Sequence, residues 1–134
     1  MSKKIAVLGT GANGSSVAAD LIRTGHDVTM IDQWAEHVET MRAKGLTIRM
    51  PEEEVYVEVD AYHLSDLAAL NRHFDVVFLL VKAYDTRWAC EIIKPYLKED
   101  GLLVGIQNAM MLDDIVDIVG PSRTIGCVVE LSSE

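Results

Sequence analysis

The chain has 134 residues, of which 49% are apolar and 25% charged, a composition typical of a globular domain with a hydrophobic core. The formal net charge of −9 argues against nucleic acid or an anionic membrane as a partner. It is compatible with a dinucleotide, because the N-terminus of a helix binds phosphate without cationic side chains.

The lengths of the apolar runs predict no membrane span and no signal peptide. No apolar run approaches about 18 residues, the length that suggests a transmembrane helix. Two lysines precede the first apolar run, but that run stops after four residues, whereas a signal peptide has a longer apolar region. We therefore expect a cytoplasmic protein.

The N-terminal part of the chain has the order strand, glycine turn, helix, strand and acid. An apolar run at 5–8 predicts a buried strand, and apolar residues at helical spacing from Val17 to Ile22 predict the helix that follows. A second strand is predicted over 27–31 and ends at Asp32. The turn reads Gly9-Thr10-Gly11-Ala12-Asn13-Gly14. This is the dinucleotide-binding fingerprint in its required context.

Each part of the fingerprint has a physical role. Gly9 permits the tight turn, Gly11 lets the backbone approach a pyrophosphate, and Gly14 lets the helix lie close to the sheet. The unpaired amides and positive dipole end of the helix would bind the phosphates. Asp32 would accept hydrogen bonds from the adenosine ribose hydroxyls. All six turn residues and Asp32 are therefore candidate cofactor-binding residues.

Two alternatives stay open here. A glycine turn can precede a helix without binding a nucleotide. Asp32 could instead cap the helix that begins near Ala35, and the two roles can coexist.

The segment after Asp32 predicts a helix, a hairpin and a short helix. The second helix would run to Lys44 and stop at Gly45. Residues 46–50 and 55–59 alternate with period two around an acidic turn, and we expect a hairpin-like excursion at the edge of the sheet. A short helix is predicted over 64–70, with Ser65 or Asp66 as its cap.

The remainder of the chain continues to alternate strands and helices. The most apolar run, 76–81, predicts a central parallel strand covered on both faces. A helix from Thr86 to about residue 93, a strand over 102–106, a helix over 112–119 and a strand over 124–131 follow. Such alternation predicts an α/β fold with a doubly wound, mostly parallel sheet, helices on both faces and ligands at the carboxyl ends of the strands.

Two polar residues follow these later strands and would face the ligand crevice. Lys82 comes directly after the central strand, and Asn108 lies in the loop after the next one. Each has a plain structural interpretation: Lys82 as a solvated lysine at a strand tip, and Asn108 as ordinary turn chemistry.

The sequence predicts no metal site. Cys90 and Cys127 have no CxxC spacing and indicate small buried residues in a reducing compartment. The four histidines also form no pattern of metal ligands. They are His26, His37, His63 and His73.

Three motifs together resemble the N-terminal domain of the ketopantoate reductase (2-dehydropantoate 2-reductase) family. These are the glycine turn, Val81-Lys82-Ala83 and Ile106-Gln107-Asn108, within a resemblance that runs from Ile5 to about Glu130. The resemblance implies a Rossmann domain and reduction of a 2-keto acid to a 2-hydroxy acid with NADH or NADPH. It also implies that Lys82 contacts cofactor or substrate, and that Asn108 helps to hold the substrate or the nicotinamide end.

The chain departs from the family pattern at three points. The family's Asn-Gly is Asn108-Ala109 here, so this backbone must avoid conformations that only glycine adopts easily. NADPH-specific members carry a basic residue where this chain has Asp32, which would repel a 2′-phosphate; NAD(H) is therefore favoured, with NADP(H) left open.

The third departure concerns the helical C-terminal domain, which carries the family's catalytic lysine and a substrate-binding glutamate. The sequence ends at Glu134, so we expect that domain to be absent and residues 1–134 to form the cofactor-binding half, inactive alone. No catalytic residue is assigned within this chain. Surface normally covered by the missing domain, around 110–111 and 128–131, could support a homo-oligomer.

A regulatory nucleotide-sensing domain is the alternative from another functional class. Domains that gate potassium channels and transporters share the glycine turn and the acid after the second strand. They typically carry Gly-Asp after the third strand, where this chain has the excursion from 46 to 59, and they give Gln107-Asn108 no role. The reductase resemblance is therefore favoured.

Overall fold

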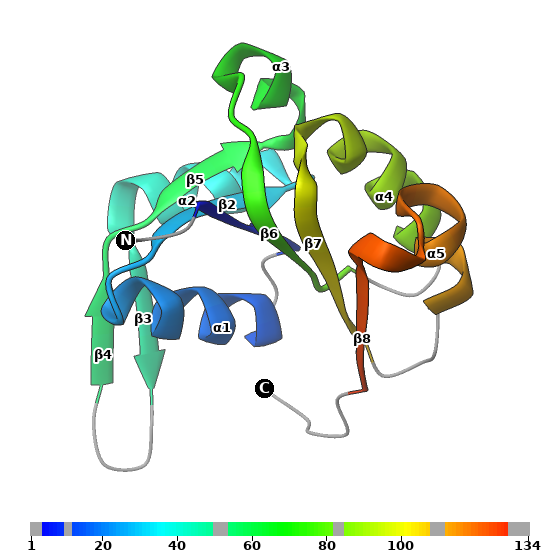
Figure 1. The fold of residues 1–134 in the computed structure, drawn as a ribbon. Coiled ribbons are helices and arrows are strands. Elements are labelled where there is room, and N and C mark those ends of the chain that lie inside the picture. The colour runs from blue at the N-terminus through cyan, green and yellow to red at the C-terminus, as the bar shows by residue number, and fades with distance from the viewer. Residues whose placement is uncertain (1–3, 10–11, 50–53, 82–84, 108–111, 129–134) are drawn as a thin grey trace.

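A six-stranded sheet lies at the centre of the computed structural model, which describes residues 4–9, 12–49, 54–81, 85–107 and 112–128 (Figure 1). Its strands are β1 (Lys4–Leu8), β2 (Asp27–Asp32), β5 (Asp60–His63), β6 (Phe74–Leu79), β7 (Leu97–Gln107) and β8 (Thr124–Val128). All neighbouring strands are parallel, in the order β5-β2-β1-β6-β7-β8. Counting only these strands, this is the 3-2-1-4-5-6 order of dinucleotide-binding folds. The predicted fold class is confirmed.

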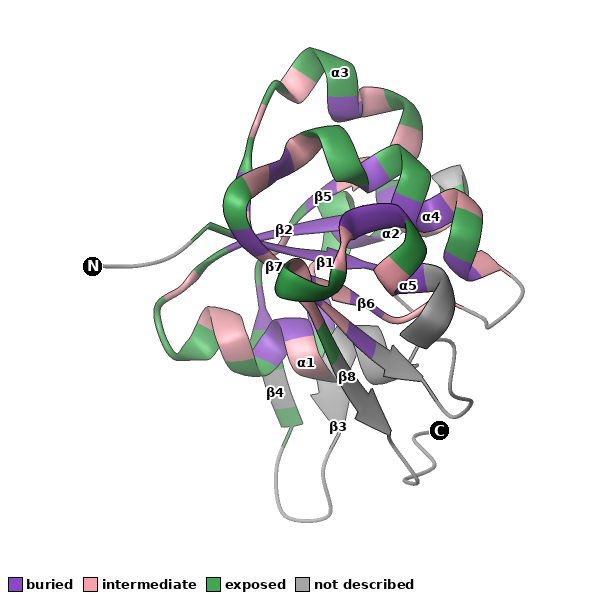
Figure 2. Ribbon diagram, turned by 45° about the vertical axis from the view of Figure 1, so that its right-hand side comes forward, coloured by how far each residue is buried: buried purple, intermediate pink, exposed green. Residues whose placement is uncertain are grey.

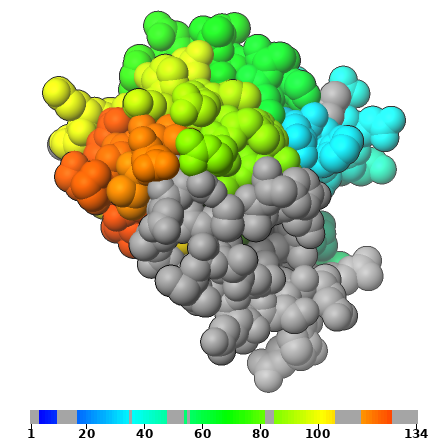
Figure 3. Space-filling view, turned by 90° about the vertical axis from the view of Figure 1, so that its right-hand side faces the viewer, coloured from blue at the N-terminus to red at the C-terminus, as the bar shows by residue number. Residues whose placement is uncertain are grey.

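Helices cover both faces of the sheet (Figure 1). One face packs against α1 (Ala12–Arg23) and α2 (Ala35–Lys44), and the other against α3 (Leu67–Leu70), α4 (Thr86–Ile93) and α5 (Leu112–Val119). Short 3-10 turns at Leu64–Asp66, Lys94–Tyr96 and Pro121–Arg123 join some of these elements. On the α4 side, α4 and α5 lie next to each other (Figure 3).

Strand β1 shows how the sequence builds this three-layer core. Ile5 and Val7 belong to the cluster under α1 and α2, whereas Ala6 and Leu8 belong to the cluster under α4 and α5. All four are buried, as the central purple strands in Figure 2 show. Because successive side chains of a strand point to opposite faces, an unbroken apolar run is needed where both faces are covered.

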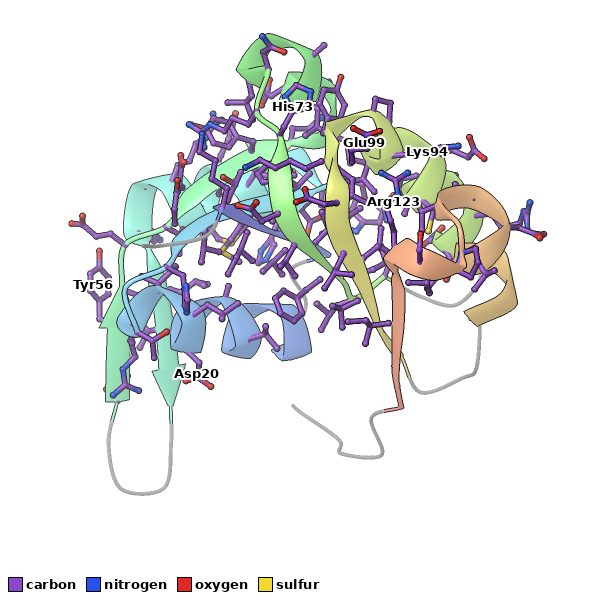
Figure 4. The ribbon with its side chains drawn as sticks, in the orientation of Figure 1. Asp20, Tyr56, His73, Lys94, Glu99 and Arg123 are labelled. Atoms are coloured by element: carbon purple, nitrogen blue, oxygen red, sulfur yellow. The ribbon has the colours of Figure 1, made fainter. Side chains whose placement is uncertain are left out.

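The hairpin is present but does not lie where we expected it. β3 (Leu46–Arg49) and β4 (Glu54–Val57) pair antiparallel, as the alternation predicts. They form a two-stranded sheet of their own beside α1, so the expectation of a hairpin at the edge of the central sheet is wrong. Leu46 and Val57 are buried in the α1 and α2 cluster, while Tyr56 projects outward (Figure 4).

The true edge on this side is β5, a strand that the sequence pattern did not predict. Arg42 of α2 donates from Nε to the carbonyl oxygen of Ala61 at 2.7 Å. Arg72 donates from Nη1 to Asp60 Oδ2 at 2.6 Å and to Thr29 Oγ1 of the neighbouring strand at 3.0 Å. These bonds attach the edge strand to α2 and to β2. The bond from Arg42 also pairs one backbone carbonyl on the open edge of β5, that of Ala61.

The expectation of Ser65 or Asp66 as the cap is met in part: Asp66 is the N-cap residue of α3, although its side chain makes no cap bond there. The 3-10 turn before α3 has a cap of its own. His63 is the N-cap, and its Nδ1 accepts from the backbone amide of Ser65 at 3.1 Å. Asp66 completes the box by accepting the backbone amide of His63 at Oδ2, at 3.1 Å. Histidine takes this role because its ring nitrogen, when unprotonated, accepts a hydrogen bond as a serine or asparagine oxygen does.

Helices α2 and α5 end where they were predicted to end, whereas β7 and β8 differ in their bounds. α2 ends at Lys44 with Gly45 as its C-cap, and α5 ends at Val119, immediately before Gly120. β7 begins at Leu97, five positions earlier than expected, with a register shift against β6 between Phe74 and Val76. The structure describes β8 to Val128, and the rest of that predicted strand lies outside the described residues.

Candidate functional site

The turn after β1 ties together the carboxyl ends of three strands. The amide of Gly9 donates to the carbonyl oxygen of Ile31 in β2 at 2.9 Å. The amide of Leu80, just after β6, donates to the carbonyl oxygen of Leu8 at 2.9 Å. The chain therefore turns within a narrow space between β2 and β6.

Only glycine fits at this turn. Gly9 has a φ of +97°, a region that residues with a side chain rarely adopt. A Cβ there would lie 2.9 Å from the backbone carbon of Leu80 and 3.1 Å from the amide nitrogen of Val81. The predicted role of Gly9 in a tight turn agrees with this geometry.

Helix α1 begins at Ala12, so the last three residues of the glycine motif belong to its first turn. Its first turn carries no acidic residue, and Arg23 occupies its last turn. The amides at its start and the positive end of its dipole are therefore not neutralised by a carboxylate on the helix itself. Such a helix N-terminus at the carboxyl edge of a parallel sheet suits a phosphate group.

Asp32 ends β2 at the same edge. The residue is only 5% exposed, and its Oδ1 accepts the backbone amide of Trp34 at 2.9 Å. Trp34 is the N-cap of α2, and its own side chain makes no cap hydrogen bond to the helix. Asp32 therefore stabilises the turn that leads into α2, which is close to the capping role considered above.

Two residues beside Asp32 were missed in the sequence. Trp34 is 67% exposed, although it is one of the largest apolar side chains in the chain. His63 lies opposite Asp32 in the register of β2 and β5, and its Nε2 is 2.8 Å from the carbonyl oxygen of Gln33. Trp34 could have been noticed in the sequence, because it is an aromatic residue two positions after the acid. The contact of His63 had no such sequence signal, because it depends on the pairing of β5, which was not predicted.

Several predicted site residues lie outside the described residues. These are Thr10, Gly11, Lys82 and Asn108. For Ala12, Asn13 and Gly14 the structure gives the helical backbone only. The structure therefore brings together Gly9, the start of α1 and Asp32, while the placement of Lys82 and Asn108 stays a prediction.

Two wider features of the described part of the chain bear on the class of site. Within it, no three His, Cys, Asp or Glu side chains are grouped so that they could hold a metal ion. No helix among these residues is long and apolar enough to cross a membrane. Cys90 lies on α4, and its side chain is buried in the core cluster on that side of the sheet.

Known proteins share this fold. D-mandelate dehydrogenase, solved with NADH and anilino(oxo)acetate, superposes with a TM-score of 0.85 at 27% identity, over 93% of this chain and 40% of that one. A PanE/ApbA family ketopantoate reductase from Ralstonia eutropha superposes with a TM-score of 0.78 at 30% identity, over 92% and 39%.

Sequence comparison gives the same family. The 2-dehydropantoate 2-reductase of Lactococcus lactis is 27% identical over 114 residues, which are 85% of this chain and 36% of the relative. That of a Nostoc species is 28% identical over 126 residues, or 92% and 38%. The chain thus spans under two fifths of these relatives. The family model for ketopantoate reductase PanE/ApbA matches residues 5–134, and the chain belongs to the ketopantoate reductase family.

Proposed function

We propose that residues 1–134 form the dinucleotide-binding domain of a ketopantoate-reductase-like oxidoreductase and hold NAD(H). One observation carries the proposal: the Gly9 amide is bonded to Ile31, the residue before Asp32. This bond places the glycine turn, the start of α1 and the acid at one edge of the sheet. A pyrophosphate at the helix start and a ribose at the acid then lie where such folds hold them.

Asp32 supports NAD(H) over NADP(H). Its carboxylate would accept hydrogen bonds from the two ribose hydroxyls, and it would repel the 2′-phosphate of NADPH. The bond from the Trp34 amide holds the carboxylate in one orientation, which lowers the entropic cost of binding a ribose. No basic residue stands at this position to offset the repulsion.

The activity proposed for a complete protein is reduction of a 2-keto acid, 2-dehydropantoate or a similar compound, to a 2-hydroxy acid. Lys82 and Asn108 would contact the substrate or the nicotinamide end, since Asn108 directly follows β7, Lys82 comes three positions after the end of β6, and both strands end at the cofactor edge. Carbonyl reduction needs a proton donor for the oxygen. The resemblance implies that this donor lies in a helical domain outside these residues. This chain would therefore bind the dinucleotide without catalysing reduction of a keto acid.

The family membership favours this function over a regulatory nucleotide sensor. The proposal is tested by titrating the chain with NADH and with NADPH under the same conditions and following heat or fluorescence. We expect NADH to bind saturably. The affinity for NADPH should be lower by about tenfold or more, the scale of a hydrogen bond to a charged group. Absence of NADH binding would overturn the cofactor assignment, and tighter NADPH binding would overturn the role of Asp32.

A further inference from the structure

The peptide group between Gln33 and Trp34 is held at both of its ends. Its carbonyl oxygen, on Gln33, lies 2.8 Å from Nε2 of His63. Its amide, on Trp34, donates to Oδ1 of Asp32 at 2.9 Å. Because a peptide group is planar, fixing the carbonyl also fixes the direction of the amide. The orientation of the Asp32 carboxylate is therefore connected to His63 through one peptide plane.

The partners of His63 define which of its ring nitrogens carries the proton. Nδ1 accepts from the backbone amide of Ser65 at 3.1 Å, and a backbone amide can only donate. Nε2 faces a carbonyl oxygen, which can only accept. These partners match the tautomer with its proton on Nε2, which donates to the Gln33 carbonyl.

His63 is itself a firm anchor for this bond. It ends β5 directly beside Asp32 in the parallel register of β2 and β5. Its own amide donates to Asp66 Oδ2 at 3.1 Å, which closes the capping box. The side chains of Gln33 and Trp34 are exposed, so their packing does little to fix the turn between them, and two hydrogen bonds hold its peptide group.

We propose that His63 is a positioning residue for the cofactor-specificity acid: it orients Asp32, through the 33–34 peptide group, toward the adenosine ribose. This inference rests on the proposed function, since it assigns a role within the NAD(H) site. His63 does not touch the dinucleotide in this account. Its effect is on the geometry of the carboxylate, and hence on the preference for NADH over NADPH.

The variant His63→Asn separates this role from the capping role. Asparagine is a favoured N-cap, and its Oδ1 takes the place of Nδ1, so the bond from Ser65 is retained. Its side chain is too short to reach the Gln33 carbonyl. His63→Gln is the conservative variant, because its terminal amide can still donate to that carbonyl. Ser65→Ala is the matched control, since it changes only the hydroxyl that lies 2.8 Å from Nδ1.

The test measures NADH and NADPH affinity, the urea midpoint and the exchange rate of the Trp34 amide by NMR. For His63→Asn we expect NADH binding weaker by about threefold to tenfold, the scale of one hydrogen bond, with NADPH less affected. The Trp34 amide should exchange faster while the urea midpoint stays near that of the unsubstituted chain. His63→Gln should recover part of the NADH affinity. Ser65→Ala should leave the affinities for NADH and for NADPH unchanged.

Other outcomes overturn the inference and show where it fails. Unchanged NADH affinity and unchanged Trp34 exchange in His63→Asn would mean that the contact does not orient Asp32. An equal loss for NADH and NADPH together with a lower urea midpoint would mean that His63 is merely structural. If the unsubstituted chain binds neither dinucleotide, the proposed function fails as well, whereas NADH binding that His63→Asn leaves intact overturns the positioning role alone.

Discussion

The amide of Gly9 donates to the carbonyl oxygen of Ile31 at 2.9 Å, which joins the turn after β1 to the last buried position before Asp32. On its other side the turn presses against Leu80, with no room for a side chain. The two halves of the proposed site, for phosphate and for ribose, are thereby set by the backbone of one residue. Substitution at Gly9 should damage both.

We expect Gly9→Ala to lower the free energy of unfolding and to abolish NADH binding. An alanine in the left-handed region costs about 1–2 kcal/mol, and here its Cβ also collides with the Leu80 backbone, so the total should exceed that figure. Gly25→Ala is the control. Gly25 also has a positive φ, of +90°, but nothing lies within 4 Å of its Cβ position. Urea unfolding should show a clearly smaller loss for Gly25→Ala; equal losses would refute the steric argument.

Trp34 should report on occupancy of the adenosine half of the site. Its indole is 67% exposed and its amide is bonded to Asp32, so a ligand at Asp32 should change the solvent around the ring. ADP-ribose is the suitable probe, because it lacks the nicotinamide that absorbs tryptophan emission. We expect its titration to change the fluorescence of the chain, Trp34→Phe to remove that change, and Trp88→Phe to keep it. A change that persists in Trp34→Phe would place the ligand elsewhere.

Stability should fall at alkaline pH because of Tyr62 in the edge strand. The hydroxyl of Tyr62 is hydrogen-bonded to the Asp60 carboxylate, and this bond, burial and the negative charge of Asp60 raise the pKa of Tyr62 above 10.0. The Arg72 guanidinium, 3.4 Å from the hydroxyl, opposes the shift only in part. The folded state therefore holds this proton more tightly than the unfolded state, so its contribution is complete below pH 10 and is lost as the pH rises through the raised value.

Unfolding measured in urea from about pH 8 to about pH 11, on either side of the ordinary tyrosine pKa, should show this decline. In Tyr62→Phe the decline should be shallower. Tyr56→Phe is the matched control, since Tyr56 is 58% exposed on the hairpin and should leave the slope unchanged. A slope that Tyr62→Phe does not alter would show that other groups cause the alkaline loss.

The chain should bind NADH without reducing a keto acid. The proton donor that carbonyl reduction needs is expected outside these 134 residues, and Lys82 is not expected to replace it. The measurement is NADH oxidation at 340 nm with 2-dehydropantoate, at a dinucleotide concentration that saturates the binding signal. Sustained turnover would contradict the proposal that these residues bind the cofactor while another domain supplies the proton donor. Lys82 would then be the first residue to substitute.

Most of the fold could be predicted because its buried strands are unbroken apolar runs and its helices have regular apolar spacing. β5 escaped prediction because an edge strand is covered on fewer sides: in Asp60–His63 only Ala61 is buried, and its neighbours are polar. The hairpin had a clear period of two, but its sequence does not say which sheet it joins. That is decided by the packing of Leu46 and Val57 against the α1 side of the core.

The site divides in the same way. Gly9 and Asp32 could be identified because local spacing fixes their places at the ends of β1 and β2. The contact between His63 and Gln33 spans 30 positions and exists only because β5 pairs with β2, so no local pattern encodes it. The cap at His63 was missed because histidine is not among the side chains that commonly cap helices.

The most direct test of the account compares Asp32→Asn with Asp27→Asn in titrations with NADH and NADPH. Both variants remove one negative charge from β2, but Asp27 is exposed at the opposite end of the strand. We expect Asp32→Asn to lower the affinity for NADH by about tenfold to a hundredfold, the scale of hydrogen bonds to a charged group, and to raise the affinity for NADPH. Asp27→Asn should change neither affinity. An Asp32→Asn chain that keeps its NADH affinity and its preference over NADPH would contradict the account.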